Sequence, residues 1–272
     1  MLEKKVALVT GVSSGIGRAT ATLLSGRGFR VFGRMRRPNG SNTALKNTEV
    51  VQLDVCDEES VRLCLRTVME RAGRIDALVN NAGYALLGSS EETSIEQAKE
   101  LFETNFFGVL RMTQAALPMM REQRSGRIVN MSSVVGFLPA PYMGVYAASK
   151  HALEGYSESL DHEVRQFGIR VSVIEPGFTR TDLGQHGQFA GQSLRDYAAD
   201  RSRAFDAIKE SIAKGEDPAR VALVVVEALT DRSPRLRYQA GREARVLSLL
   251  KKVAPAQLLD RGIRKQFGLE AA

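Results

Sequence analysis

The sequence predicts an α/β fold built on a doubly wound parallel sheet of about seven strands, with helices on both faces. Short runs rich in β-branched residues alternate with longer segments of helical periodicity, which is the pattern of consecutive β-α-β units. The strand-like runs are largely apolar, as in Val6-Ala-Leu-Val9, and suit strands that are covered on both sides. No Pro/Gly/Ser-rich linker and no internal repeat divides the 272 residues, so we expect a single domain over residues 1–272.

The strands are predicted wherever a short apolar run occurs. In chain order these runs lie at residues 5–10, 30–33, 50–53, 77–80, 127–131, 170–174 and 236–239. The final run favours only a short strand. Because parallel strands need crossover connections, helices are expected between most of them.

Longer periodic segments predict those helices. They lie at residues 15–26, 58–72, 95–122, 146–167 and 218–229, and Pro118 falls near the end of the third. Two regions lack a clear place in this alternation. Residues 181–215 are rich in Gly and Gln and are interpreted as a substrate lid. Residues 242–272 form a basic, amphipathic extension, which favours a solvated helix over a membrane anchor.

Composition excludes several function classes. The net charge of +7 is scattered, and no nucleic-acid-binding motif accompanies it, so we expect no nucleic-acid partner. No apolar run reaches the roughly 18 residues of a membrane span, and the first residues lack the features of a signal peptide. We therefore expect a cytoplasmic protein. Cys56 and Cys64 are the only cysteines and show no metal-binding spacing, so no metal is expected.

A glycine-rich turn lies between the first strand and the first helix. It reads Thr10-Gly-Val-Ser-Ser-Gly-Ile-Gly17. Glycines let a backbone turn tightly and approach a pyrophosphate, which then sits on the helix N-terminus. The spacing GxxxGxG differs from the common GxGxxG, and a glycine turn alone also suits a purely structural role. Its place at the first strand–helix junction favours a Rossmann-like dinucleotide site.

The end of the second strand is basic. The stretch Gly33-Arg-Met-Arg-Arg37 carries Arg34, Arg36 and Arg37 where an acid would accept hydrogen bonds from the adenosine ribose hydroxyls. Guanidinium groups suit a 2′-phosphate through charge-assisted contacts. We predict NADP(H) in preference to NAD(H), with Arg36 as the leading contact. A solvated basic turn is the alternative.

Tyr146 and Lys150 are four residues apart and share one face of a predicted helix. A tyrosine hydroxyl, with an ordinary pKa of about 10, is a poor acid–base catalyst near neutral pH. A cation one turn away favours the phenolate, so we expect a lowered tyrosine pKa. Two serines, Ser132 and Ser133, follow the predicted strand at 127–131. With the glycine turn, these residues predict a nicotinamide-dependent oxidoreductase.

The chain resembles the short-chain dehydrogenase/reductase family, in its shorter-subunit branch, from about residue 4 to residue 177. The resemblance rests on motifs in a characteristic order. They are Thr10–Gly17, Asp54-Val55, Asn80-Asn-Ala-Gly83, Asn105, Ser133, Tyr146, Lys150 and Pro176-Gly177. Ser133 is chosen over Ser132 because the family's serine lies 13 residues before its tyrosine.

The resemblance implies a role for each matching position. Ser133, Tyr146 and Lys150 are implied to be catalytic, with Tyr146 as general acid and base, and Asn105 to hold a water that links Lys150 to solvent. The phosphate turn is implied to consist of Gly11, Ser13, Ser14, Gly15, Ile16 and Gly17. Further cofactor contacts are implied for Asp54, Val55, Asn81, Ala82 and Gly83, and, at the nicotinamide, for Pro176, Gly177 and Thr179. Asn80 is implied to support the central strand.

Glu175 departs from the family pattern, which often has a small or polar residue before the proline. Beyond Gly177 the resemblance fades. We expect the substrate pocket to form from residues 84–87, 135–137, 142–143 and 178–189, with Val135, Met143 and Phe178 as contacts. These residues are largely apolar and predict a carbonyl or alcohol on an apolar body.

Two other function classes stay open. A cofactor-binding redox regulator needs no proton donor, and the Ser133–Tyr146–Lys150 set argues against it. A nucleotide-sugar epimerase or dehydratase also uses a Tyr/Lys pair but usually has a longer C-terminal domain. Helices over 101–120 and 146–167 resemble those that pair subunits in the family, which implies a homodimer or homotetramer.

Overall fold

A seven-stranded parallel sheet forms the centre of the computed structural model, which describes residues 4–35, 47–180 and 188–269. The strand order is β3-β2-β1-β4-β6-β7-β9, and every neighbouring pair is parallel. The strands are β1 (Val6–Val9), β2 (Arg30–Met35), β3 (Thr48–Gln52), β4 (Ala77–Asn80), β6 (Gly126–Met131), β7 (Ile169–Pro176) and β9 (Arg237–Ala240). The predicted doubly wound sheet is confirmed; β4 has the predicted bounds, and no other strand end differs from its predicted position by more than two residues.

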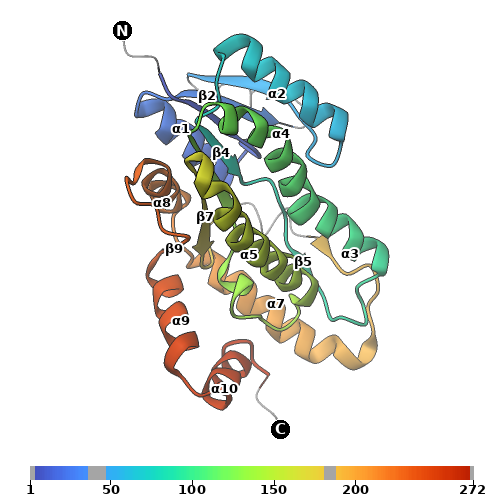
Figure 1. Ribbon diagram of the computed structural model, residues 1–272. Helices are drawn as coiled ribbons and strands as arrows, with labels where there is room; N and C mark the ends of the chain where they lie inside the picture. The colour runs from blue at the N-terminus through green and yellow to red at the C-terminus, as the bar shows by residue number, and fades with distance from the viewer. Residues whose placement is uncertain (1–3, 36–46, 181–187, 270–272) are drawn as a thin grey trace.

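Alternate residues of the strands supply two separate cores, one on each face. Val6 and Leu8 of β1 join a core covered by α2 (Glu58–Ala72), α4 (Gly108–Glu122) and α5 (Gly144–Val164). Ala7 and Val9 face the other core, beneath α1 (Gly15–Gly26) and α8 (Pro218–Thr230). Figure 1 shows α8 and α2 on opposite sides of the sheet. Because both faces are covered, the strands are apolar at successive positions rather than at alternate ones.

The helix predicted over residues 95–122 is interrupted. It consists of α3 (Ile95–Phe102), a π-helical turn η2 (Glu103–Phe107) and α4. Gly108 follows the turn, and a Cβ there would lie 2.8 Å from Cγ2 of Val55. The extra residue of the π turn lets the chain pass closely over Val55, and such turns often mark functional positions.

The region interpreted as a lid contains regular structure in its described part. Its strand β8 (Gln188–Phe189) pairs with β5 (Leu86–Leu87), and helix α7 (Ala198–Ala213) follows a 3₁₀ turn, η5 (Arg195–Tyr197). The carboxylate of Glu92, which is fully buried, pairs with Arg201 of α7 and accepts a hydrogen bond from Leu194 N at 2.7 Å. This buried ion pair holds α7 against the loop after β5. Residues 181–187 lie outside the described part of the chain.

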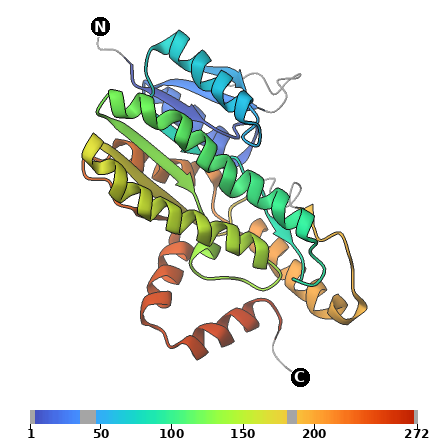
Figure 2. The same cartoon turned by 45° about the vertical axis from the view of Figure 1, so that its right-hand side comes forward.

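The C-terminal extension is a pair of helices, α9 (Arg242–Val253) and α10 (Ala256–Gln266). Figure 2 shows the pair projecting from the sheet layers at the C-terminal end of the chain. Phe267 and Leu269 return to the body and pack with Ala204 and Ile208 of α7. Among the residues that the structure describes, none of the helices is long and apolar enough to cross a lipid bilayer.

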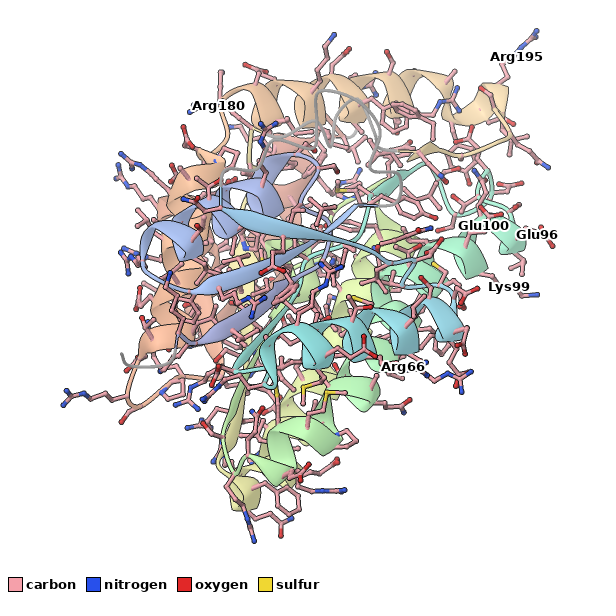
Figure 3. All side chains as sticks on the ribbon, turned by 90° about the horizontal axis from the view of Figure 1, so that it is seen from above. Arg66, Glu96, Lys99, Glu100, Arg180 and Arg195 are labelled. Carbon is pink, nitrogen blue, oxygen red and sulfur yellow. The ribbon has the colours of Figure 1, made fainter. Side chains whose placement is uncertain are left out.

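Charged side chains lie on the outside of these layers. Figure 3 shows Arg66 of α2 and Lys99 and Glu100 of α3 pointing outward, and all three are exposed. Arg195, beside α7, also projects from the surface. The charge is dispersed over several elements, as the sequence indicates.

Candidate active site

The glycine-rich turn is built by close packing around Gly11 and Gly17. Gly11 has φ of +70°, a backbone conformation that favours glycine. A Cβ on Gly17 would lie 2.1 Å from the Gly11 carbonyl oxygen and 2.4 Å from Nδ2 of Asn81. Only glycine at position 17 lets the first turn of α1 approach the preceding turn so closely. The N-terminus of α1 therefore opens at the end of β1, a place that suits an anionic pyrophosphate.

Asn81 holds this turn in place. Its side-chain amide donates hydrogen bonds to the carbonyl oxygens of Thr10 and Gly11, at 3.0 and 2.9 Å. The Thr10 hydroxyl in turn accepts hydrogen bonds from the backbone N–H groups of Asn81 and Ala82, each at 2.9 Å. Asn81 and Ala82 thus fix the turn from the neighbouring strand. Asn80, the buried last residue of β4, donates a hydrogen bond to Oδ1 of Asn130 in β6 at 2.9 Å.

Asp54, Val55 and the arginines after β2 are the residues predicted to contact the adenosine end of the cofactor. Oδ1 of Asp54 accepts a hydrogen bond from Cys56 N at 3.1 Å, and the Val55 side chain is 2% exposed within the core beside Gly108. The backbone of Arg34 belongs to β2. Arg36 and Arg37 lie outside the described residues, so the predicted phosphate contact stays a prediction.

Tyr146 and Lys150 lie one turn apart on α5, as their spacing predicts. The Lys150 ammonium is 5.7 Å from the centroid of the Tyr146 ring and donates a hydrogen bond to the Met131 carbonyl oxygen at 2.8 Å. Met131 is the last residue of β6. Ser133 lies two residues later, and hydrogen bonding from its side chain acts to lower the pKa of Tyr146. The end of one buried strand therefore positions the serine and the lysine around the tyrosine.

The pKa of Tyr146 differs from the sequence-based expectation. Burial raises the Tyr146 pKa to about 12, and the hydrogen bond with Ser133 opposes this rise. Burial lowers the pKa of Lys150 to about 8, opposed by the negative charge of Glu154. The predicted lowering of the tyrosine pKa by the lysine is wrong, because the pKa of Tyr146 is raised. Removal from water disfavours the charged form of both groups, which raises the pKa of the tyrosine and lowers the pKa of the lysine.

Asn105 lies in the π turn and is almost fully buried. Its Oδ1 accepts a hydrogen bond from Tyr84 N at 3.0 Å, and its Nδ2 donates one to the Tyr84 carbonyl oxygen at 2.9 Å. A Cβ on Gly83 would lie 2.8 Å from Oδ1 of Asn105 and 3.9 Å from Nζ of Lys150. The two hydrogen bonds of Asn105 therefore fix the backbone of Tyr84, after β4, close to Lys150.

Two buried carboxylates, Glu154 and Glu175, interact near the site, and neither was among the predicted site residues. Glu154, one turn after Lys150, accepts a hydrogen bond from Nε of Arg237 at 3.0 Å. Glu175, 1% exposed, accepts one from Nε2 of Gln239 at 2.6 Å. Burial and the charge of Glu154 raise the pKa of Glu175 to about 7. The signal in the sequence was a lone acidic residue directly before Pro176-Gly177, where the family often has a small or polar residue.

Ser133, Tyr146 and Lys150 open on one cavity that also contacts nine of the other residues predicted for the site. Its walls include Ile16, Asn81, Gly83, Pro176, Gly177 and Thr179, predicted at the cofactor, and Val135, Met143 and Phe178, predicted at the substrate. The predicted residues that do not line it are Gly11, Ser13, Ser14, Gly15, Gly17, Arg34, Asp54, Val55, Ala82 and Asn105. Ile208 and Ile212 of α7 also line the cavity and were missed. Only the tertiary contacts of α7 place them there.

Known proteins resemble the chain over most of its length. Residues 5–188 match the family described as short chain dehydrogenase. A 3-ketodihydrosphingosine reductase of Bacteroides thetaiotaomicron is 35% identical over 90% of this chain and 91% of its own. Retinol dehydrogenase 8 of Homo sapiens is 37% identical over 92% of this chain and 85% of its own.

Solved structures give the same result. A short-chain dehydrogenase from Streptomyces avermitilis superposes with a TM-score of 0.82 at 36% identity, covering 96% of this chain and 99% of that one. A relative from Burkholderia phymatum, solved in complex with NAD, has a TM-score of 0.79 at 26% identity and covers 93% and 95%. On the match of its sequence and the agreement of its fold, this chain belongs to the short-chain dehydrogenase family of oxidoreductases.

Proposed function

We propose that the protein transfers hydride between a nicotinamide dinucleotide and a carbonyl or alcohol carbon on a largely apolar substrate, with Tyr146 as general acid and base. The observation that carries the proposal is the meeting of Ser133, Tyr146 and Lys150 in one cavity with otherwise mainly apolar walls. When bound, the nicotinamide supplies or accepts the hydride. The protein positions the reacting carbon and handles the proton.

In the direction of alcohol, the carbonyl oxygen gains negative charge. The hydroxyls of Tyr146 and Ser133 donate hydrogen bonds to it and stabilise the transition state more than the ground state. The raised pKa keeps the Tyr146 hydroxyl protonated near neutral pH, so the proton donor is ready. After the proton moves to the substrate oxygen, the Lys150 ammonium and the Ser133 hydroxyl stabilise the phenolate. We assign Asn105 to the water that returns a proton through Lys150.

The cofactor is proposed to bind along the turn at Gly11–Gly17. The glycines and the N-terminus of α1 suit the pyrophosphate, because a Cβ at position 17 would close this cradle. Ser13, Ser14, Gly15 and Ile16 complete the turn. Asp54 and Val55 are assigned to the adenine, Asn81, Ala82 and Gly83 to the ribose side, and Pro176, Gly177 and Thr179 to the carboxamide.

We propose a preference for NADP(H), because Arg34, Arg36 and Arg37 follow β2 with no acid among them. The Burkholderia relative was solved with NAD, so family membership leaves the choice open. The test compares kcat/KM for NADPH and NADH in the wild type and in Arg36→Ala. We expect a preference for NADPH that weakens in the variant. A preference for NADH that Arg36→Ala leaves unaltered would contradict the assignment.

The substrate class follows from the apolar walls at Val135, Met143 and Phe178. The names of two relatives, a 3-ketodihydrosphingosine reductase and a retinol dehydrogenase, describe a ketone and an alcohol on apolar bodies. Both support a carbonyl or alcohol on an apolar substrate. Neither name is transferred to this chain.

The decisive experiment follows oxidation of NADPH and NADH in the presence of ketones and aldehydes, and the reverse reaction with alcohols. We expect turnover with apolar carbonyls. Tight cofactor binding without turnover on the whole panel would favour a redox regulator. Conversion of a nucleotide sugar without net cofactor oxidation would favour an epimerase or dehydratase.

The protein is also proposed to form a homodimer or homotetramer through α4, α5 and the π turn. Phe107, in that turn, is 44% exposed and packs edge-to-face on Phe106. Light scattering of the purified protein tests this assembly, and a monomer at assay concentration would contradict it.

A further inference from the structure

A second apolar cavity, of about 350 Å³, lies between the C-terminal helix pair and the body of the protein. Its walls are supplied mainly by apolar residues of α9 and α10 and of the loop after β6. They include Leu247 and Leu250 of α9, Leu259 and Ile263 of α10, and Leu138 and Pro139 of the loop. The volume lies within the range of roughly 300–1,000 Å³ that is usual for small-ligand sites.

This cavity adjoins the candidate active site. Val134, Val135 and Phe178 line both cavities, so the two cavities meet at these residues. Phe178 is also tied to the C-terminal pair, because its backbone N–H donates a hydrogen bond to Oε2 of Glu243 in α9 at 3.3 Å. The loop that contacts the reaction cavity and the helix that borders the second cavity are thus connected directly.

The two cavities differ in size and polarity. The reaction cavity holds about 140 Å³ and carries the polar groups of Ser133, Tyr146 and Lys150. The second cavity is more than twice as large and its polar side chains are few, namely Glu243 and Gln266. The smaller one accommodates a reacting carbonyl group, whereas a long apolar chain attached to it needs further space lined by hydrocarbon.

We propose that the second cavity receives the apolar tail of the substrate, so that the C-terminal helix pair selects long-chain carbonyl compounds or alcohols. The inference rests on the proposed function, because it places the reacting carbon beside Tyr146. The tail passes Phe178 and lies between α9 and α10 and the body. Burying apolar surface in this cavity supplies binding energy without any polar recognition.

The test is a chain-length series of straight-chain 2-ketones, assayed with NADPH and NADH. Each methylene that enters an apolar site contributes about 0.8 kcal/mol, which corresponds to a roughly 4-fold gain in kcat/KM. We expect this gain for chains long enough to reach beyond Phe178. It should level off once the cavity is filled.

Two variants that fill the cavity are compared with two matched controls. Ala254 lines the cavity and Ala256 does not, so Ala254→Leu is expected to abolish the gain for long ketones while Ala256→Leu keeps it. Gly262 also lines the cavity, and a Cβ there would meet no neighbouring atom within 4 Å. Gly262→Leu is expected to act like Ala254→Leu, with Gly26→Leu, at a helical glycine equally free of neighbours, as its control.

Short ketones separate the two possible failures. If the wild type reduces short ketones but shows no gain with chain length, or if Ala254→Leu and Gly262→Leu leave the gain intact, the tail site is wrong and the proposed function stands. A change of oligomeric state in these variants with an unaltered gain would assign the cavity to a subunit contact instead. Absence of turnover with every ketone and aldehyde would overturn the proposed function itself.

Discussion

The Lys150 ammonium donates a hydrogen bond to the main-chain carbonyl oxygen of Met131 at a distance of 2.8 Å. This bond joins helix α5 to the last residue of β6, an interior strand that lies between β4 and β7. Because Ser133 lies two residues beyond Met131, the same strand end positions both partners of Tyr146. The geometry around the tyrosine is therefore set by a buried strand that is paired on both sides.

Lys150→Met should impair both cofactor binding and turnover. The variant keeps the apolar stem but loses the charged donor, and a hydrogen bond to a charged group contributes enough for a roughly 10- to 100-fold effect. Dinucleotide titration and steady-state kinetics measure the two effects, with the exposed Lys99→Met as the control.

In the wild type, kcat/KM for reduction should fall as the pH rises through about 8, because Lys150 then loses its charge. A flat profile up to about pH 9 would argue against this role.

Tyr146→Phe should lose most turnover and keep cofactor binding, since it removes only the proton donor. Loss of a general acid costs roughly 10²–10⁴-fold in kcat. Tyr156→Phe is the matched control, because Tyr156 lies on the same helix with its ring packed edge-to-face on Phe106. Comparable kcat values for Tyr146→Phe and the wild type would exclude Tyr146 as the acid.

Gly17→Ala should disrupt the phosphate turn. The new Cβ would lie 2.1 Å from the Gly11 carbonyl oxygen, so the backbone must move. We expect weaker dinucleotide binding and a loss of about 1–3 kcal/mol in the free energy of unfolding. Gly26→Ala meets no neighbouring atom within 4 Å and should be neutral or stabilise by about 0.4–1 kcal/mol. Calorimetric titration and urea unfolding measure these changes, and equal behaviour of the two variants would refute the close-packed turn.

Glu175 should make the folded protein less stable as the pH rises. Its pKa in the folded protein, about 7, is above the value of about 4.3 for an unfolded chain, so the folded state binds the proton more tightly. Its contribution to the free energy of unfolding is complete below the unfolded pKa and is lost as the pH rises through about 7.

Glu175→Gln should remove this contribution. Urea unfolding at about pH 5 and about pH 8 should show a smaller loss of stability in the variant than in the wild type. The exposed Glu122→Gln, at the end of α4, serves as control and should follow the wild type. Identical pH dependence in Glu175→Gln and the wild type would show that Glu175 ionises normally in the folded protein.

The sequence by itself determined the parallel sheet, the glycine turn and the Tyr146–Lys150 pair. These features depend on local properties, since apolar runs, helical periodicity and an i, i+4 spacing can be recognised without knowing what lies nearby. The order of the motifs along the chain also placed Ser133 and Asn105 in the candidate site.

Tertiary structure alone decided how these residues are surrounded. It reversed the expected direction of the Tyr146 pKa, because the cost of burial depends on the packing around the group. It also brought Ile208 and Ile212 to the cavity, buried Glu175 beside Glu154, inserted the π turn at Asn105, and formed the apolar cavity beneath α9 and α10. Each of these depends on contacts between segments distant in the chain, which no local pattern encodes.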